Sequence, residues 1–239
     1  MFAIEVHNLS KSYYGVPVLR GLNFSVSPGD SFGFAGANGA GKSTLLKCLL
    51  DFCHYQSGDL RLFDRSCKNR RARARLAFLP ERFIPPYYLT GEQFLQFMMK
   101  LQGDTYIAEQ VRQMLAGLDL DAAALKKPVR SFSKGMTQKL GLASCFLAKR
   151  DIYILDEPMS GLDPKARALV KQQFQKLTAR GATLFFTSQM LADIDEICSR
   201  IGVLHQGRIC YLGAPADMRE QFGGGTLEEA YLRAIGDHA

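Results

Sequence analysis

The sequence lacks the features that mark membrane-spanning, secreted and repetitive proteins. Among its 239 residues, no apolar run reaches the roughly 18–20 residues that a membrane-spanning helix requires. The first residues, Met1 to Glu5, contain no basic segment followed by an apolar one, so no secretion signal is predicted. We find no internal repeat and no low-complexity segment. These absences predict a cytoplasmic globular protein.

Metal-binding spacings are also absent. No C-x-x-C pair occurs, so the cysteines are predicted to be core or surface thiols of a reducing compartment. The six cysteines are Cys48, Cys53, Cys67, Cys145, Cys198 and Cys210. The histidines have no paired nucleophile or metal partner and are predicted to be ordinary surface or packing residues: His7, His54, His205 and His238.

The composition is that of an ordinary globular protein, 47% hydrophobic and 22% charged. A chain of this length can bury a sizeable core and suits one α/β domain, or one domain with a subdomain. We therefore expect a single domain over residues 1–239.

Much of the net charge of +7 lies in one basic segment, which contains Lys68, Arg70, Arg71, Arg73 and Arg75. The alternation Arg-Ala-Arg-Ala-Arg predicts a strand that carries its charges on one face. Such a face could contact nucleic acid, lie against an anionic membrane, or simply be solvated. No aromatic residue interleaves with the charges, which disfavours nucleic acid.

The most informative segment is the octet Gly36-Ala37-Asn38-Gly39-Ala40-Gly41-Lys42-Ser43, which matches G-x-x-x-x-G-K-[ST]. An apolar run at 31–35 predicts a buried strand before it, and a helix follows to about residue 52. Glycines let successive N–H groups curl around an anion, and the helix N-terminus adds partial positive charge. The octet predicts a phosphate-binding loop.

This loop predicts residues for ATP and for Mg²⁺. Lys42 would contact the β- and γ-phosphates, and the Ser43 hydroxyl would bind the metal. The predicted nucleotide-binding residues of this segment are Gly36, Asn38, Gly39, Ala40, Gly41, Lys42, Ser43 and Thr44.

A second motif is the apolar run 152–155 followed by Asp156 and Glu157. Buried parallel strands deliver their carboxyl ends to the ligand crevice. Asp156 would reach Mg²⁺, and Glu157 would orient or deprotonate the attacking water. Together with the octet, this pair predicts nucleoside-triphosphate hydrolysis.

The remaining pattern alternates strands with helices. A capping box, Thr90 with Gln93, opens a mostly helical segment over about 87–149. Asp163 and Pro164 predict the start of a helix that runs to about residue 180. Further strands are predicted at 2–7, 22–27, 59–63, 75–79 and 183–186, a helix at 190–198, a hairpin over 201–212, and two short helices around 223–225.

Two more segments complete a recognisable order: Ser131 to Lys139, which contains Phe-Ser-Lys-Gly-Met, and Ser160 to Asp163. With the octet and the acidic strand end, they resemble the ATP-binding-cassette (ABC) ATPases over nearly the whole chain. The first resembles the family's signature and the second its D-loop. The resemblance implies an α/β fold. It has a P-loop NTPase core with a mostly parallel sheet, an N-terminal antiparallel β subdomain and the inserted helical subdomain.

The resemblance also implies roles for further residues. Tyr13 occupies the place of the aromatic residue that stacks on adenine, and Val18 is its apolar neighbour. Ser133 and Gly135 would bind ATP held by the phosphate loop of a second ABC subunit, in a homo- or heterodimer. Binding of ATP would then close the dimer and hydrolysis would open it.

The chain departs from the family pattern at three places. Lys134 and Met136 alter the signature, in a form similar to that of bacterial cassette exporters. Glu81 occupies the position of a metal-sensing glutamine and can itself bind a hydrated metal. Gln189 occupies the position of the switch histidine, and its amide can donate a hydrogen bond to the γ-phosphate without becoming cationic.

The leading hypothesis is the ATPase subunit of a membrane transporter, which drives a separate integral membrane permease, in the export direction. It would act on the inner face of the membrane. An apolar loop with Phe83, Ile84, Tyr87 and Tyr88 could dock that partner or be buried. The alternatives are a non-transport cassette that acts on nucleic acid, ribosomes or the division machinery, and a nucleotide switch with negligible turnover. Nucleic acid is the less favoured partner.

Overall fold

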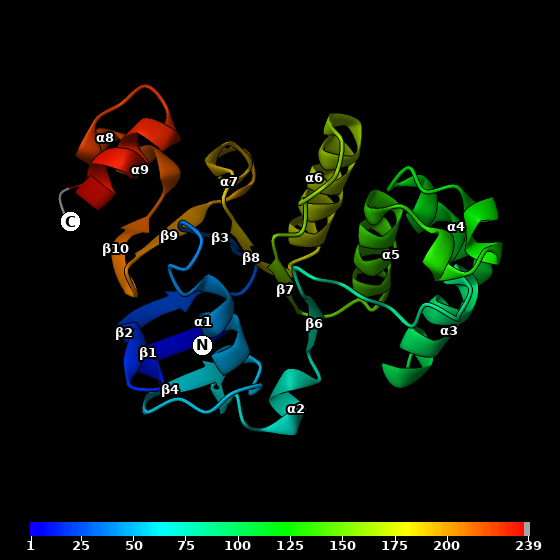
Figure 1. The fold of residues 1–239 in the computed structure, drawn as a ribbon, viewed down its shortest axis with the longest axis horizontal. Helices are drawn as coiled ribbons and strands as arrows, with labels where there is room; N and C mark the ends of the chain where they lie inside the picture. The colour runs from blue at the N-terminus through cyan, green and yellow to red at the C-terminus, as the bar shows by residue number, and fades with distance from the viewer. Residues whose placement is uncertain (237–239) are drawn as a thin grey trace.

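Two β-sheets and a helical insertion form the structure, a computed structural model that describes residues 1–236 (Figure 1). His238 and the two residues beside it lie outside the described residues. Within residues 1–236, no helix is both long and apolar enough to cross a bilayer.

The N-terminal sheet is antiparallel. Its spatial order is β2 (Val16–Val26), β1 (Ile4–Tyr13), β4 (Ser57–Leu62) and β5 (Arg65–Ser66). The sequence prediction ended the first strand at residue 7 and began the second at 22, which is wrong. The strands continue to a two-residue turn, Tyr14–Gly15, whose φ values of 51° and 82° suit a tight hairpin.

The second sheet is parallel except for its edge strand β10, which confirms the predicted mostly parallel core. Its spatial order is β10 (Arg208–Gly213), β9 (Arg200–His205), β3 (Ser31–Ala35), β8 (Thr183–Ser188), β7 (Ile152–Asp156) and β6 (Leu76–Leu79). Strands β3, β7 and β8 are buried along their whole length, as their apolar runs predict.

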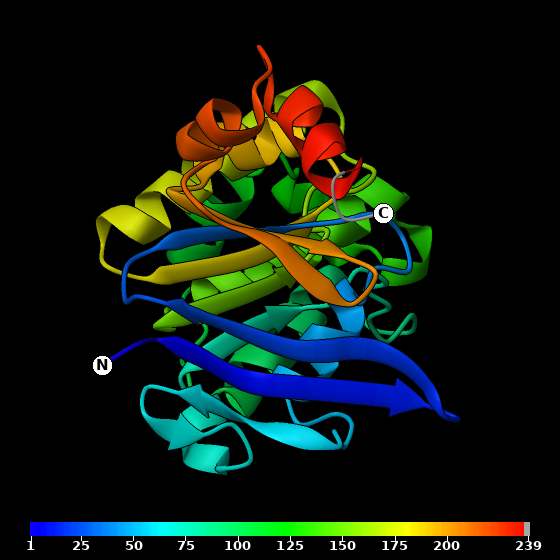
Figure 2. The same ribbon diagram turned by 90° about the vertical axis from the view of Figure 1, so that its left-hand side faces the viewer.

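Aromatic packing joins the two sheets. Phe24 of β2 stacks on Phe32 of β3, with ring centroids 5.8 Å apart, and on Phe185 of β8, at 6.1 Å. The β9–β10 hairpin also lies against β2, where the Arg20 N–H donates to the Gly207 carbonyl oxygen at 2.9 Å (Figure 2). The antiparallel sheet is thereby fixed against the parallel one.

Helices cover the parallel sheet. They are α1 (Lys42–Leu49), α6 (Pro164–Ala179), α7 (Leu191–Ile197), α8 (Pro215–Phe222) and α9 (Leu227–Gly236). Helix α6 begins as predicted, because the Asp163 carboxylate caps the Ala166 N–H at 2.9 Å and Pro164 is the first helical residue. The two predicted C-terminal helices are confirmed as α8 and α9.

The basic segment is not the strand that its alternation predicted. Residues Arg70–Arg73 form a short helix, α2, because the Asn69 side chain accepts from the Arg71 N–H at 2.9 Å. Arg73 pairs with Asp51 at 3.0 Å, and Arg75 pairs with Asp151 at 2.7 Å. The arginines therefore do not share one face, and two of them are held by carboxylates of this chain.

The helical insertion lies between β6 and β7. It contains α3 (Gly91–Leu101), α4 (Ala108–Ala116), the 3₁₀ turns η1 (Ala122–Lys126) and η2 (Val129–Ser131), and α5 (Lys134–Leu147). The capping box at Thr90 and Gln93 is confirmed. Helices α3 and α4 pack on α5, and α5 packs against β6 (Figure 1).

The two ends of the α3–α4 unit meet. Thr90 and Pro128 form an isolated antiparallel bridge. On either side of it, the Val129 N–H donates to the Leu89 carbonyl oxygen at 2.8 Å and the Gly91 N–H donates to the Lys127 carbonyl oxygen at 3.2 Å. The chain therefore enters and leaves this unit at one place.

Candidate functional site

The predicted phosphate-binding loop joins the end of β3 to the start of α1. Gly39 and Gly41 adopt φ values of 81° and 114°, which disfavour residues with a side chain. At Gly36 a Cβ would lie 2.6 Å from the Leu204 carbonyl oxygen. The glycines of the octet are thus required by backbone conformation and by close packing on β9.

A cavity of about 290 Å³ opens in front of this loop. Most of the predicted site residues line it: Tyr13, Val18, Asn38, Gly39, Gly41, Lys42, Ser43, Thr44, Glu81, Asp156, Glu157 and Gln189. Gly36 and Ala40 do not line it. They support the loop through hydrogen bonds. The Gly36 carbonyl oxygen accepts from Lys42, and the Ala40 N–H donates to the Ala37 carbonyl oxygen at 3.2 Å.

The N-terminus of α1 is open to this cavity. Gly41 is its N-cap, and no side chain of the described residues caps the first turn. Lys42, Ser43 and Thr44, the first residues of the helix, line the cavity. Uncapped N–H groups and the helix dipole together favour an anion at this position, so the loop fits a phosphate group.

Lys42 is almost fully buried in the wall of the cavity. Its Nζ donates to the Gly36 carbonyl oxygen at 2.5 Å and to the Ala37 carbonyl oxygen at 3.3 Å, and lies 3.8 Å from Glu157 Oε1. Burial lowers the pKa of this amine, while the carboxylates of Glu157, Asp156 and Glu81 raise it in opposition. An anionic group in the cavity would replace the weak carbonyl partners of a charged lysine.

Asp156 and Thr187 stand at the carboxyl ends of the adjacent strands β7 and β8. The Thr187 hydroxyl donates to Asp156 Oδ1 at 2.5 Å and accepts from the Glu157 N–H at 3.0 Å. Thr187 thus orients both acidic residues. No role is predicted for Thr187 from the sequence, although a hydroxyl at the end of a buried parallel strand was the available signal.

Glu157 is strained and incompletely satisfied. Its φ of 49° lies in the left-handed region. Oε2 accepts from the Gln189 N–H at 3.3 Å, whereas Oε1 is buried without a hydrogen-bond partner. Burial raises the pKa of this carboxyl, and Lys42 opposes the rise. A buried carboxylate oxygen that lacks a donor, on a residue that lines the cavity, fits a water molecule that must lose a proton.

The oxygen ligands that Mg²⁺ prefers also line the cavity: the Ser43 hydroxyl and the carboxylates of Asp156 and Glu81. Within residues 1–236, no group of three or more histidine, cysteine or acidic side chains could hold a metal alone. Mg²⁺ is ordinarily held by one or two carboxylates together with substrate phosphates and water, so these donors fit it.

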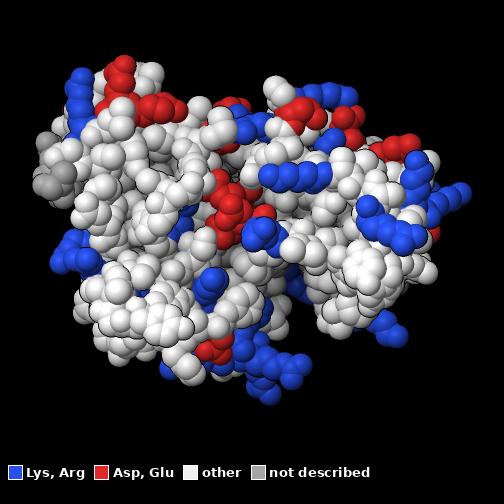
Figure 3. All heavy atoms as spheres, viewed as in Figure 1, with Lys and Arg blue, Asp and Glu red and all other residues white. Residues whose placement is uncertain are grey.

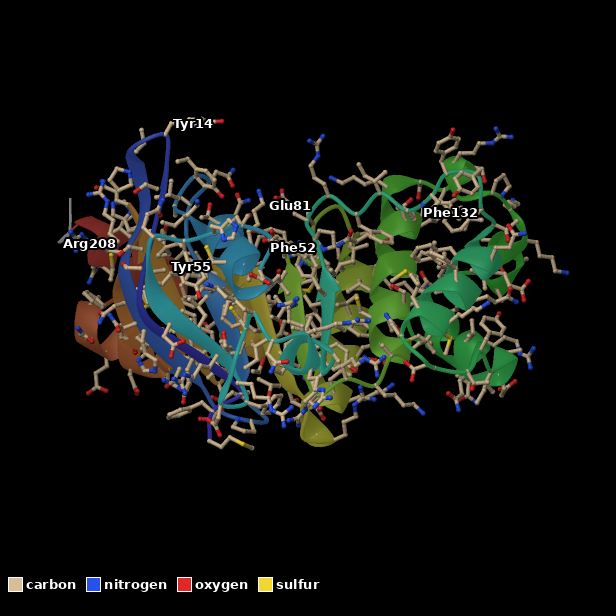
Figure 4. The ribbon with its side chains drawn as sticks, turned by 90° about the horizontal axis from the view of Figure 1, so that it is seen from below. Tyr14, Phe52, Tyr55, Glu81, Phe132 and Arg208 are labelled. Atoms are coloured by element: carbon tan, nitrogen blue, oxygen red, sulfur yellow. The ribbon has the colours of Figure 1, made fainter. Side chains whose placement is uncertain are left out.

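Glu81 follows β6 and lies between the two halves of the molecule (Figure 4). It lines the phosphate-loop cavity and also a second cavity, of about 510 Å³, on the side of the helical insertion. On the face of the molecule seen in Figure 1, Figure 3 shows a group of acidic side chains in the middle, with basic side chains beside it. The segment after β6 therefore connects the nucleotide cavity with the helical insertion.

The apolar loop after Glu81 was predicted to be either buried or a docking surface, and the structure buries one part of it and exposes the other. Phe83 packs edge-on against Phe94 of α3, with ring centroids 5.6 Å apart. Ile84, Tyr87 and Tyr88 are exposed, at 83%, 67% and 71%. Burial holds for Phe83, whereas Ile84, Tyr87 and Tyr88 are exposed, with the rings of the two tyrosines 5.7 Å apart.

Tyr13 and Val18 form the open wall of the cavity. The ring of Tyr13 is partly exposed, and Lys11 Nζ lies 4.4 Å from its centroid. Its hydroxyl donates to Cys53 Sγ at 3.8 Å. A partly exposed ring fixed at both its face and its hydroxyl is suited to stack on a planar base.

Ser133 and Gly135 do not join this cavity. Ser133 caps α5, accepting from the Met136 N–H at 3.2 Å, and a Cβ at Gly135 would lie 3.7 Å from the Gly161 carbonyl oxygen. Lys134 beside them is exposed. The signature-like segment therefore adjoins the D-loop-like segment of the same chain and does not line the phosphate-loop cavity.

Known proteins resemble this chain in sequence and in fold. The sequence pattern of the family described as "ABC transporter" matches residues 19–160. An ABC transporter ATP-binding protein of Synechocystis is 36% identical over 228 residues, which cover 90% of this chain and 64% of that protein. Nod factor export ATP-binding protein I of Paraburkholderia xenovorans is 36% identical, over 90% of this chain and 71% of that one.

The fold of a solved ATP-binding subunit of an ABC transporter also matches. Its TM-score is 0.89 at 29% sequence identity, with 98% of this chain and 99% of that chain covered. The fold and the cavity define a P-loop ATPase of α/β class. The chain belongs to the ABC transporter family, as an ATP-binding subunit.

Proposed function

We propose that this chain hydrolyses ATP and drives a separate integral membrane permease, in the export direction. The observation that carries the proposal is that the predicted ATP-binding residues lie in two separate places on the chain. One cavity contains a phosphate loop and an unsatisfied carboxylate, while Ser133 and Gly135 lie outside it. The proposed unit is one ABC ATPase domain over residues 1–239, with the helical subdomain at about 87–149.

Mg²⁺–ATP, when bound, supplies a phosphoryl group that is open to attack by water. Lys42 exchanges its carbonyl partners for phosphate oxygens, and the N–H groups of the loop hold the same phosphates. Ser43, Asp156 and Glu81 would hold the metal. Tyr13 and Val18 hold the base.

Glu157 is the proposed general base. Its free Oε1 accepts a proton from the attacking water, and the raised pKa brings it nearer to that of an effective base at neutral pH. The Gln189 N–H holds the other oxygen, so the side chain is oriented before substrate binds. The Gln189 side-chain amide would donate to the γ-phosphate.

A second ABC subunit completes the site. The N-terminus of α5, with Ser133 as its cap, is a further anion-binding helix start that has no phosphate to bind within its own chain. In a head-to-tail dimer, identical or not, it would cover the ATP of the partner. Binding of ATP would then favour the closed dimer.

Two observations support a permease partner. Ile84 of the exposed loop lines one cavity together with Glu81, which also lines the ATP cavity, so a protein docked on this loop could sense the nucleotide. The export direction rests on the name of the Nod factor export relative. The chain would work at the inner face of the cell membrane. Because it spans 64% of the Synechocystis relative, the whole protein's partners are part of the proposal.

The test is co-purification from membranes of the source cell, compared with sedimentation before and after ribonuclease. We expect the chain to co-purify with a polytopic protein in the membrane fraction. A triple variant with Ile84, Tyr87 and Tyr88 changed to serine should no longer be found in that fraction. Sedimentation that depends on RNA would instead support a cassette acting on nucleic acid or ribosomes. Phosphate release by the purified chain tests the ATPase activity, and its absence would support a nucleotide switch.

A further inference from the structure

Two thiols meet directly beneath the proposed base-binding wall. Cys48, in α1, is fully buried, and Cys53, in the turn after that helix, is partly exposed. Their Sγ atoms are 3.6 Å apart. A disulfide requires about 2.05 Å, so the two sulfur atoms would need to approach by roughly 1.5 Å.

A third thiol lies close but is directed elsewhere. Cys67 Sγ donates to the Cys48 carbonyl oxygen at 3.7 Å. Among the described residues, Cys67 Sγ makes no hydrogen bond with another sulfur. The geometry therefore selects one pair out of the three cysteines.

The pair is connected with the nucleotide cavity at both ends. Cys48 belongs to the helix whose first residues, Lys42 to Thr44, line the cavity. Cys53 Sγ accepts the hydroxyl of Tyr13, another lining residue, at 3.8 Å. A bond between the sulfur atoms would draw Cys53 toward α1 and away from that hydroxyl.

We propose that Cys48 and Cys53 form a peroxide-sensitive thiol pair whose oxidation to a disulfide weakens ATP binding. The formation of the disulfide is independent of the function proposed above. The effect on affinity rests on Tyr13 belonging to the ATP site.

The oxidant is hydrogen peroxide. Cys53, the accessible member, attacks one peroxide oxygen as its thiolate. The O–O bond breaks, and the leaving hydroxide takes up the proton that the thiol released when it ionised, which forms water. Cys48 then attacks the resulting sulfenic sulfur, an S–S bond forms, the S–O bond breaks, and a second water leaves with the Cys48 proton. Two thiols are oxidised by two electrons, and one peroxide is reduced to two waters.

Burial makes this reaction slow. It raises the pKa of the Cys48 thiol to about 12, so the resolving step needs a proton acceptor or a transient opening of the turn. The experiment therefore follows oxidation over hours at millimolar peroxide. Cys145 and Cys198 are buried and their thiol pKa values are also raised, so they are expected to stay reduced.

Proteolysis with trypsin reads out the pairing without ambiguity. Cleavage after Lys47 and Arg61 leaves Cys48 and Cys53 on one peptide, 48–61, whereas Cys67 falls on the short peptide 66–68. After peroxide treatment and alkylation of the full chain, we expect peptide 48–61 to be unalkylated and lighter by two hydrogens. Dithiothreitol should restore it. The Cys53→Ser variant should show no such peptide, and Cys210→Ser should behave as the unmodified protein.

Binding of trinitrophenyl-ATP gives the second readout. Loss of the Tyr13 hydrogen bond predicts an affinity about two- to fivefold weaker in the oxidised protein, reversed by dithiothreitol and absent in Cys53→Ser. A link from peptide 66–68 to either cysteine, or oxygen addition without a disulfide, would overturn the pairing. A disulfide with unchanged affinity would overturn the coupling. If the reduced protein itself failed to bind the nucleotide, the proposed function would fall, while the mass readout would still decide the disulfide.

Discussion

Replacement of Glu157 by glutamine tests the proposed general base most directly. The two side chains have nearly the same shape, and the amide oxygen can still accept from the Gln189 N–H, which now lies 3.3 Å from Oε2. The amide NH₂ would then occupy the place of Oε1, 3.8 Å from Lys42 Nζ. There it can neither take a proton from water nor pair with the lysine.

The expected loss of activity is large and specific to the chemical step. Removal of a positioned general base slows a reaction by about 10²–10⁴-fold, which corresponds to roughly 3–5 kcal/mol in the barrier. Lys42 loses a neighbouring carboxylate and is freed for phosphate. We therefore expect ATP affinity to be equal or somewhat tighter, and the ATP-bound dimer to persist.

Stability provides an independent check with a defined sign. The pKa of Glu157 is raised above its ordinary value of 4.5, mainly by burial. A raised folded-state pKa favours folding below the unfolded-state pKa, and this contribution is lost as the pH rises through the folded-state value. Glutamine never carries the charge. The Glu157→Gln protein should therefore melt no lower than the unmodified protein at pH 7.5, and any difference should shrink toward pH 4.5.

The assay combines phosphate release with Mg²⁺–ATP, gel filtration with ATP, and thermal melts between pH 4.5 and 8. The matched control is Glu220→Gln, which changes an exposed glutamate of α8 and should leave all three measurements unchanged. A fall in phosphate release of less than about tenfold would refute the role of Glu157 as base. Persistence of a monomer with ATP would count against the head-to-tail dimer.

Four further outcomes follow from the same geometry. Gln189→His should raise phosphate release and make it pH-dependent near the ordinary imidazole pKa of about 6.5; unchanged turnover at all pH values would contradict the role of this side chain. Gly41→Ala should destabilise the fold more than Gly39→Ala in chemical denaturation, because both need a positive φ but only the Gly41 Cβ would meet Leu19, at 2.7 Å; equal losses would contradict this. Ser133→Ala should cost about 1 kcal/mol of stability through the lost cap and should reduce ATP-dependent dimerisation in gel filtration, whereas an unaffected dimer would place the signature outside the interface. Tyr13→Ala should weaken binding of trinitrophenyl-ATP severalfold while Tyr14→Ala does not, since Tyr14 is fully exposed at the hairpin tip (Figure 4); equal effects would argue against stacking.

Local chemistry made much of the fold predictable. The octet and the strands on either side of the site are short segments whose pattern has one common structural solution. The capping box at Thr90 and the Asp163–Pro164 start are likewise set by neighbours in the chain. Long-range pairing was less accessible. The first hairpin extends to Tyr14 because β1 pairs with β2 and with β4, and partners across a sheet leave little trace in local hydropathy.

Two misjudged features show which interactions sequence patterns conceal. The alternating arginines favoured a strand, but the Asn69 cap and the carboxylates of Asp51 and Asp151 fix a helical turn instead. Thr187 was passed over because its importance depends on Asp156, which lies on a neighbouring strand and 31 residues away in the chain. Spatial proximity of this kind arises only when the sheet forms.

The bridge between Thr90 and Pro128 has a practical consequence for protein engineering. Because the α3–α4 unit begins and ends at one point, a homologous unit could replace residues 91–127 through two adjacent junctions. Such a graft would leave every residue that lines the phosphate-loop cavity unchanged, since all of them lie outside this range. Chimaeras built at these junctions would separate what the exchanged helices recognise from how the chain handles nucleotide.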